Sequence, residues 1–233
     1  MRPKRAEDIL LDTEGDVETV HIPADDVSLT GDLVVPANAR GLVVFAHGSG
    51  SSRTSPRNQH VASVLNAGGY ATLLFDLLTT NEEAVDAATG HLRFDIELLT
   101  RRLVAAIDWT TEHPAASLPM GLFGASTGAA GALEAAVARP ERVKAVVSRG
   151  GRPDLALDAL ARVTAPTLLI VGGADTEVIR LNEIALARLA VDKKMVLVKG
   201  ATHLFEEPGA LDEVSRLALG WFEQYLVVRR RAA

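Results

Sequence analysis

Gly124-Ala125-Ser126-Thr127-Gly128 lies between a short apolar run and a run rich in helix formers. Residues 118–123 predict a strand, and residues 129–138 predict a helix. A serine at a sharp strand-to-helix turn is held in a strained backbone conformation that presents its hydroxyl at the top of the sheet. The pattern therefore predicts a nucleophilic serine, Ser126. The alternative is a serine that only caps the following helix.

Strand-like and helix-like runs alternate through most of the chain, which is typical of an α/β fold: a mostly parallel, twisted sheet with helices on both faces. The predicted strands are residues 17–22, 27–35, 41–46, 71–75, 118–123, 143–147, 167–171 and 195–198. The predicted helices are residues 58–67, 93–111, 129–138, 154–162, 177–189 and 211–228. The first two strands are joined by only four residues, so we expect an antiparallel pair at one edge.

Residues 1–233 are interpreted as one α/β domain, since no linker or repeat divides them. Only 19 residues separate the strand ending at Val147 from the one starting at Thr167, which leaves no room there for a lid domain. We therefore expect the site to be covered by loops alone.

Composition excludes several functional classes. The formal charge of −6 disfavours binding to nucleic acid, and the basic run Arg229–Arg231 is interpreted as a solvated tail. The longest apolar stretches are strand-sized, so no membrane span is expected. The charged N-terminus has no signal-peptide pattern, so we expect a cytoplasmic protein. The absence of cysteine excludes disulfides, thiolate metal sites and a cysteine nucleophile.

A nucleophilic serine needs a base, and histidine has a suitable pKa. Triads of the strand–turn–helix type follow the order serine, acid, histidine along the chain. Of six histidines, only His203 follows Ser126, and it lies in a loop between a predicted strand and the last predicted helix. His203 is therefore the predicted base.

The acid should lie between these two residues, at the end of another strand. Asp175 fits best, because it follows an apolar strand and the glycine-rich turn Gly172-Gly173-Ala174. Asp154, after the preceding strand, is the alternative acid. Either aspartate could instead simply cap a helix.

A tetrahedral intermediate needs hydrogen-bond donors for its oxyanion, normally two backbone N–H groups. Thr127 supplies one, since it directly follows the nucleophile. The second is expected in the turn His47-Gly48-Ser49-Gly50, where we favour Ser49 over Gly50. His47 is expected to brace this loop through its ring.

On these motifs and Ala201-Thr202-His203, the chain resembles the α/β-hydrolase superfamily, and within it the lidless dienelactone hydrolase-like group, over essentially its full length. The resemblance implies a sheet of about eight strands and hydrolysis of an ester, lactone or thioester through an acyl-serine. The chain differs from dienelactone hydrolases proper, which use a cysteine nucleophile, because it contains no cysteine. Residues 51–58 also look like a segment of such proteins that are sometimes fused to phosphoribosyltransferase domains, and we expect no such second domain here.

The predicted activity is that of a carboxylesterase-like serine hydrolase acting on a small ester-type molecule, with no cofactor and no metal. Candidate substrate-binding residues are Gly50, Arg53, Arg149 and Phe205, with Arg57 and Arg152 as further arginines near strand ends.

Other functions stay open at this point. One is a non-catalytic ligand-binding or regulatory module on the same fold. Another is an acyltransferase or perhydrolase that uses the same acyl-serine. A dinucleotide site at residues 48–53 is disfavoured because Arg53 stands where a third glycine is needed. A metal site at His203, Glu206 and Glu207 lacks a second histidine at helical spacing.

Overall fold

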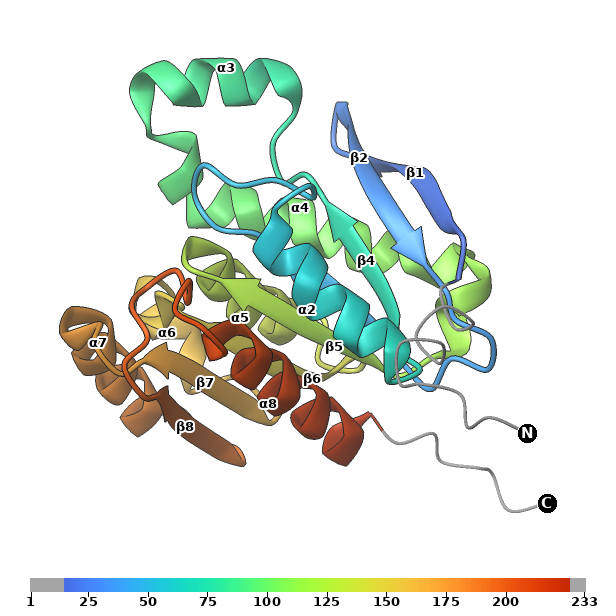
Figure 1. Cartoon of the computed structure of the whole chain (residues 1–233). Helices are drawn as coiled ribbons and strands as arrows, with labels where there is room; N and C mark the ends of the chain where they lie inside the picture. Colours follow the sequence, from blue (N-terminus) through green and yellow to red (C-terminus); the bar gives the residue numbers. More distant parts are fainter. Residues whose placement is uncertain (1–14, 227–233) are drawn as a thin grey trace, which may run out of the picture.

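The computed structural model describes residues 15–226, which form an eight-stranded sheet covered by helices. In sequence order the strands are β1 (Val17–Ala24), β2 (Val27–Val34), β3 (Leu42–Ala46), β4 (Ala71–Phe75), β5 (Met120–Ala125), β6 (Val143–Arg149), β7 (Thr167–Gly172) and β8 (Lys193–Val198). Their spatial order is β1-β2-β4-β3-β5-β6-β7-β8. Figure 1 shows β5 near the middle of this twisted sheet. This is the α/β-hydrolase fold that the sequence predicts.

The sheet has one antiparallel edge. β1 pairs antiparallel with β2, and β2 pairs antiparallel with β4, whereas every pairing from β4 through to β8 is parallel. The carboxyl ends of the parallel strands therefore meet at one edge of the sheet, where ligands bind in open α/β folds.

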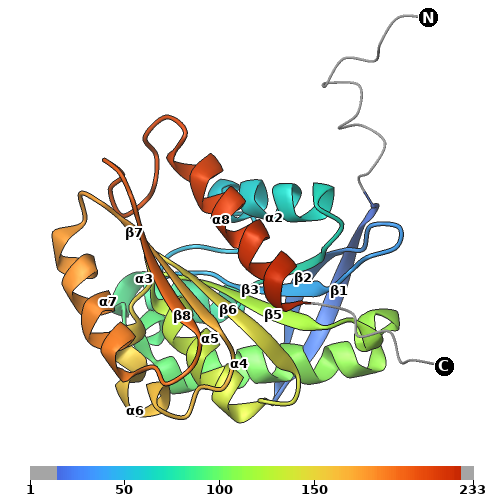
Figure 2. The same ribbon diagram turned by 90° about the horizontal axis from the view of Figure 1, so that it is seen from below.

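Helices cover both faces. They are α2 (Pro56–Ala67), α3 (Thr80–Thr89), α4 (Ile96–Trp109), α5 (Thr127–Ala138), α6 (Leu157–Leu160), α7 (Thr176–Arg188) and α8 (Ala210–Tyr225). Figure 2 shows α2 and α8 on one face and α4 and α5 on the other.

Each face has its own core because side chains alternate along a strand. In β3, Val43 and Phe45 pack in the cluster that includes residues of α2 and α8. Val44 and Ala46 pack in the other cluster, with residues of α4 and α5. The central strands are buried on both sides, which agrees with their unbroken apolar sequence.

The structure contains one helix that the sequence analysis did not predict. Helix α3 follows β4, and Figure 1 shows it standing out from the body of the protein. Asp86 is its only fully buried residue, so α3 has no apolar stripe from which a helical period could be recognised. The signal that was available is the capping box, in which Thr79 Oγ1 accepts from the Glu82 N–H and Glu82 accepts from the Thr79 N–H.

Two other expectations need adjustment. The helix predicted over residues 93–111 is interrupted: a 3₁₀ turn at Leu92–Phe94 precedes α4, which begins after its cap Asp95. The short helix predicted over residues 154–162 is a 3₁₀ turn followed by α6. Part of the predicted last helix, residues 227 and 228, and the Arg229–Arg231 run lie outside the described residues. Within residues 15–226, no helix is both long and apolar enough to cross a membrane.

The turn between β5 and α5 depends on close packing at Gly124. A Cβ atom on Gly124 would lie 2.5 Å from Ala129 Cα and 2.8 Å from the Gly128 carbonyl oxygen, and neither backbone atom can move independently.

We predict that Gly124→Ala lowers the free energy of unfolding by about 1–3 kcal/mol, measured by urea denaturation. Gly131→Ala in α5 is the matched control, because its Cβ meets only ordinary contacts. The control should be neutral or more stable by about 0.5–1 kcal/mol. Equal losses in the two variants would contradict this account.

Candidate active site

Ser126 occupies the turn between β5 and α5, with φ of 49° and ψ of −123°. Few non-glycine residues adopt a positive φ, so this backbone conformation is held by its surroundings. Its N–H donates to the Arg149 carbonyl oxygen at 3.3 Å, and its own carbonyl oxygen accepts from the N–H groups of Ala129 and Arg152 at 3.1 and 3.0 Å. Hydrogen bonds to both sides of the turn thus hold the serine in place.

The end of β3 lies directly against this turn. A Cβ atom on Gly48 would come within 2.8 Å of Ser126 Cβ, so only glycine fits at position 48. The loop after β3 is therefore packed against the serine.

The structure brings His203 and Asp175 together. His203 Nδ1 lies 2.8 Å from Asp175 Oδ2, and the histidine side chain keeps 39% exposure while the carboxylate is mostly buried. Asp175 also caps α7, because its Oδ1 accepts from the Val178 N–H at 3.4 Å. One carboxylate thus contacts the histidine and also caps a helix, two arrangements that the sequence left as alternatives.

His203 also lies close to the serine turn. A Cβ on Gly150 would be 3.6 Å from His203 Cε1, and Gly150 directly follows Arg149, whose carbonyl oxygen accepts from Ser126. The imidazole therefore lies over the end of β6, next to the turn that carries Ser126.

Asp154 is engaged elsewhere. Arg152 donates to both of its carboxylate oxygens, each at 2.8 Å. This paired geometry satisfies the carboxylate and is typical of strong arginine–carboxylate contacts.

The loop after β3 presents free backbone donors. In the described part of the chain, the N–H groups of Ser49 and Gly50 donate to no acceptor. Thr127 is the first residue of α5, and the first N–H groups of a helix have no acceptor within it. The hydroxyls of Ser49 and Thr127 are 3.0 Å apart and hydrogen-bonded, so they join the two segments that carry these donors.

His47 braces this loop. Its Nδ1 donates to the Gly48 carbonyl oxygen at 3.0 Å, and its Nε2 accepts from the Leu77 N–H at 2.9 Å. Burial lowers the pKa of His47. The ring is therefore neutral and connects the ends of β3 and β4.

A pocket of about 310 Å³ lies between this loop and α3. Its lining residues are His47, Gly48, Ser49, Gly50, Ser51, Ser52, Leu77, Leu78, Glu83, Asp86, Ala87, Arg93, Leu99 and Thr127. We expected loops alone over the site, but on this side a helix contributes to the cover, although one ten-residue helix is not a lid domain. The sequence analysis missed the lining residues of α3 because it missed the helix.

The four candidate substrate-binding residues lie in different surroundings. Gly50 lines this pocket. Arg53 forms ion pairs with Asp76 and Asp32. Phe205 is only 1% exposed and packs in the core on the α2 and α8 face.

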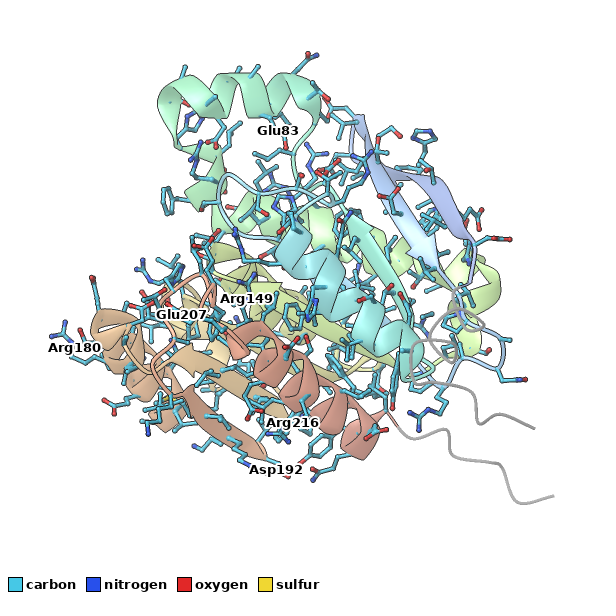
Figure 3. All side chains as sticks on the ribbon, viewed as in Figure 1. Glu83, Arg149, Arg180, Asp192, Glu207 and Arg216 are labelled. Atoms are coloured by element: carbon cyan, nitrogen blue, oxygen red, sulfur yellow. The ribbon has the colours of Figure 1, made fainter. Side chains whose placement is uncertain are left out.

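Arg149 is buried in the interior, near the start of α2 (Figure 3). Its Nη2 donates to Asn58 Oδ1 at 3.1 Å, and its guanidinium lies 5.9 Å from the centre of the Phe205 ring. No carboxylate within residues 15–226 forms an ion pair with it. Burial, together with repulsion from Arg57, lowers the pKa of Arg149 to about 10. Arg149 thus links the first turn of α2 to the loop that carries His203.

The two glutamates after His203 contact other partners. Glu206 pairs with Arg57, and Glu207 accepts from the N–H and hydroxyl of Thr202. Among the residues that the structure describes, no three potential metal ligands come together.

A family model for the dienelactone hydrolase family matches residues 29–225, which is most of the chain. The chain belongs to the dienelactone hydrolase family. Membership of this family supports a hydrolase function.

Similar proteins agree with this assignment. A dienelactone hydrolase from Anabaena variabilis, known from its crystal structure, is 58% identical in sequence to this chain. The two structures superpose with a TM-score of 0.88 over 91% of this chain and 98% of that one. An esterase domain from a Rhodothermus marinus protein has the same fold, with a TM-score of 0.71 at 20% identity, over 91% of this chain and 99% of that one.

A Mycobacterium tuberculosis protein, provisionally named a phosphoribosyl transferase, is 55% identical to this chain over 90% of its length. The chain spans only 46% of that relative's length.

The surroundings of His47 predict a pH dependence of stability. The Leu77 N–H points at Nε2, so a proton on Nε2 would bring two donors together. A lowered pKa in the folded state means that the unfolded state binds more protons, so stability is full above about pH 6.5 and falls as pH decreases below that value. We predict that His47→Gln reduces the slope of unfolding free energy against pH between pH 7.5 and 5 by up to about 1.4 kcal/mol per unit. Urea denaturation at several pH values measures this slope for the wild type and the variant. Identical slopes in the two proteins would contradict a buried neutral ring.

Proposed function

We propose that this chain is a carboxylesterase-like serine hydrolase (EC 3.1.1) that cleaves a carboxylic ester, lactone or thioester through an acyl-serine intermediate. Ser126 is the nucleophile, His203 the general base and Asp175 the acid that orients it. The observation that carries the proposal is the 2.8 Å contact between His203 and Asp175, with the imidazole over the end of β6 beside the strained turn of Ser126.

The reaction follows from these positions. Ser126 Oγ attacks the carbonyl carbon while its proton passes to His203 Nε2, and Asp175 holds the Nδ1–H tautomer and stabilises the imidazolium. The tetrahedral intermediate then collapses, and the leaving alcohol takes the proton from His203. Water repeats the sequence on the acyl-serine and releases the acid.

The proposed oxyanion hole consists of the backbone N–H groups of Thr127 and Ser49. The Ser49 N–H donates to no acceptor in the described residues, and the hydroxyl contact between these two side chains keeps their segments together. Donors positioned in advance stabilise charge that develops in the transition state, and loss of one costs about 10²–10³ in kcat.

Two alternatives have less support. The provisional transferase name belongs to a relative of which this chain spans 46%, so the name alone does not assign a transferase activity to the matched part. Transfer of the acyl group to an alcohol or to peroxide uses the same acyl-serine, and product analysis with competing nucleophiles separates it from hydrolysis.

Removal of the proposed nucleophile or the proposed base should almost abolish ester hydrolysis. Ser126→Ala or His203→Ala should lower turnover of p-nitrophenyl acetate by about 10⁴ to 10⁶, because triad members act as a unit. A fluorophosphonate probe should label the wild type and fail to label Ser126→Ala. Activity retained in either variant would overturn the assignment of that residue, whereas a wild type that is neither labelled nor active would favour the non-catalytic module.

Amide substitutions at Asp175 and Asp154 separate the two candidate acids. Asp175→Asn should reduce kcat by about 10⁴, since an amide supports the wrong histidine tautomer. Asp154→Asn is the matched control, because its carboxylate pairs with Arg152 and not with His203. The control should stay within about threefold of the wild type, and a larger loss in Asp154→Asn than in Asp175→Asn would reassign the acid.

A further inference from the structure

The pocket between α3 and the loop after β3 adjoins the proposed oxyanion hole. Ser49 and Thr127 both line it, as does Gly48, which packs against Ser126. Its volume of about 310 Å³ is at the lower end for ligand pockets, so it suits a small group.

The pocket lies on the acyl side of the reacting carbonyl. The leaving group must take its proton from His203, so it lies beside the His203 loop. No residue of that loop lines the pocket. The other substituent of the carbonyl carbon, which is the acyl group, therefore points toward α3.

Carboxylates dominate the rim beneath α3. Asp86 is paired with Arg93, which leaves no net charge at that position. Outside the pocket lining, Arg53 lies between Asp76 and Asp32, so one guanidinium is shared by two carboxylates. Glu83 adds a further carboxylate that lines the pocket, and Figure 3 shows it below α3. Among the charged residues that line the pocket, Glu83 is therefore the carboxylate that no paired cation neutralises.

Glu83 is available to a ligand. Within residues 15–226 its carboxylate accepts no hydrogen bond and forms no ion pair, in contrast to Glu82 and Asp86 on the same helix. Burial and repulsion from Asp76 raise the pKa of Glu83, while the nearby Arg53, which forms its ion pairs with Asp76 and Asp32, acts in the opposite direction. A free carboxylate accepts hydrogen bonds but repels a second carboxylate.

The inner wall of the pocket is apolar. It is formed by the buried Leu77, Leu78 and Leu99, while the exposed Ala87 of α3 lines the pocket from the outer side. A larger side chain at Ala87 would therefore reduce the space available to an acyl chain.

We propose that this pocket binds the acyl group of the substrate, and that it selects a short acyl chain carrying a hydrogen-bond donor, a hydroxyl or an ammonium, which Glu83 accepts. An acyl group that carries a carboxylate is rejected. The proposal rests on the proposed serine-hydrolase function.

The first experiment tests whether the acyl chain enters the pocket. Ala87→Phe fills it, whereas Ala88→Phe adds the same ring to a neighbouring exposed position of α3 that does not line it. In Ala87→Phe, kcat/KM should fall at least about tenfold for p-nitrophenyl butyrate and octanoate and least for acetate. Ala88→Phe should follow the wild type throughout. Equal profiles in the two variants would overturn the assignment of the pocket.

The second experiment tests the chemistry of the acyl group. The substrates are four methyl esters with four-carbon acyl groups: those of butanoate, 3-hydroxybutanoate and 3-aminobutanoate, and monomethyl succinate. Hydrolysis is measured as the release of acid. The hydroxyl or the ammonium ester should exceed butanoate in kcat/KM by about tenfold, and monomethyl succinate should be the poorest. Glu83→Gln should remove the ammonium preference and retain part of a hydroxyl preference, since an amide oxygen still accepts. Glu97→Gln, on exposed α4 surface, is the control.

The outcomes separate the two proposals. If the wild type cleaves no ester of either series, or if cleavage persists in Ser126→Ala, the serine-hydrolase function is overturned and this inference with it. If Ser126-dependent cleavage occurs but butanoate or monomethyl succinate is preferred, the hydrolase stands and the donor-bearing acyl group is overturned.

Discussion

The positive φ of Ser126 is the constraint on which the surrounding structure depends. A conformation of this kind costs about 1–3 kcal/mol and persists only where neighbouring segments enforce it. Three segments do so: β6 and the following loop bind its N–H and carbonyl groups, Gly124 lets α5 pack against β5, and Gly48 brings the end of β3 against its side chain. The segments that hold this turn thus belong to the central strands, which are almost entirely buried.

The loop after β3 is positioned by neutral contacts. His47 joins it to β4 through the Leu77 N–H, and the Ser49 hydroxyl joins it to Thr127. Ser49 Oγ also lies 3.4 Å from the Arg93 carbonyl oxygen, and Arg93 binds Asp86 of α3. A continuous series of contacts therefore runs from α3 to Thr127, the residue after the proposed nucleophile, so the helix and the proposed oxyanion donors share one supporting network.

Sequence and structure agree where local patterns are strong. Ser126 and Asp175 follow the buried strands β5 and β7, and His203 follows the edge strand β8. Parallel strands bring such positions to one edge of the sheet, so chain order and strand ends were enough to predict that His203 and Asp175 lie together. Helix α3 was missed because its faces are nearly all solvent-exposed and its attachment is by ion pairs, which leave no hydrophobic period. The neutral state of His47 and the burial of Arg149 depend on tertiary contacts that no local pattern records.

The sheet and helix α3 are stabilised by different kinds of contact, so substitutions in them have different consequences. The strands that precede Ser126 and Asp175 are packed in the apolar cores, so a change there alters stability together with the positions of these residues. Helix α3 is held mainly by the Asp86–Arg93 and Glu82–Arg102 pairs and buries almost no apolar surface. Its pocket-facing positions can therefore change without loss of core packing. Because the proposed acyl-binding residues lie on this element, acyl selectivity can be altered independently of the proposed catalytic residues.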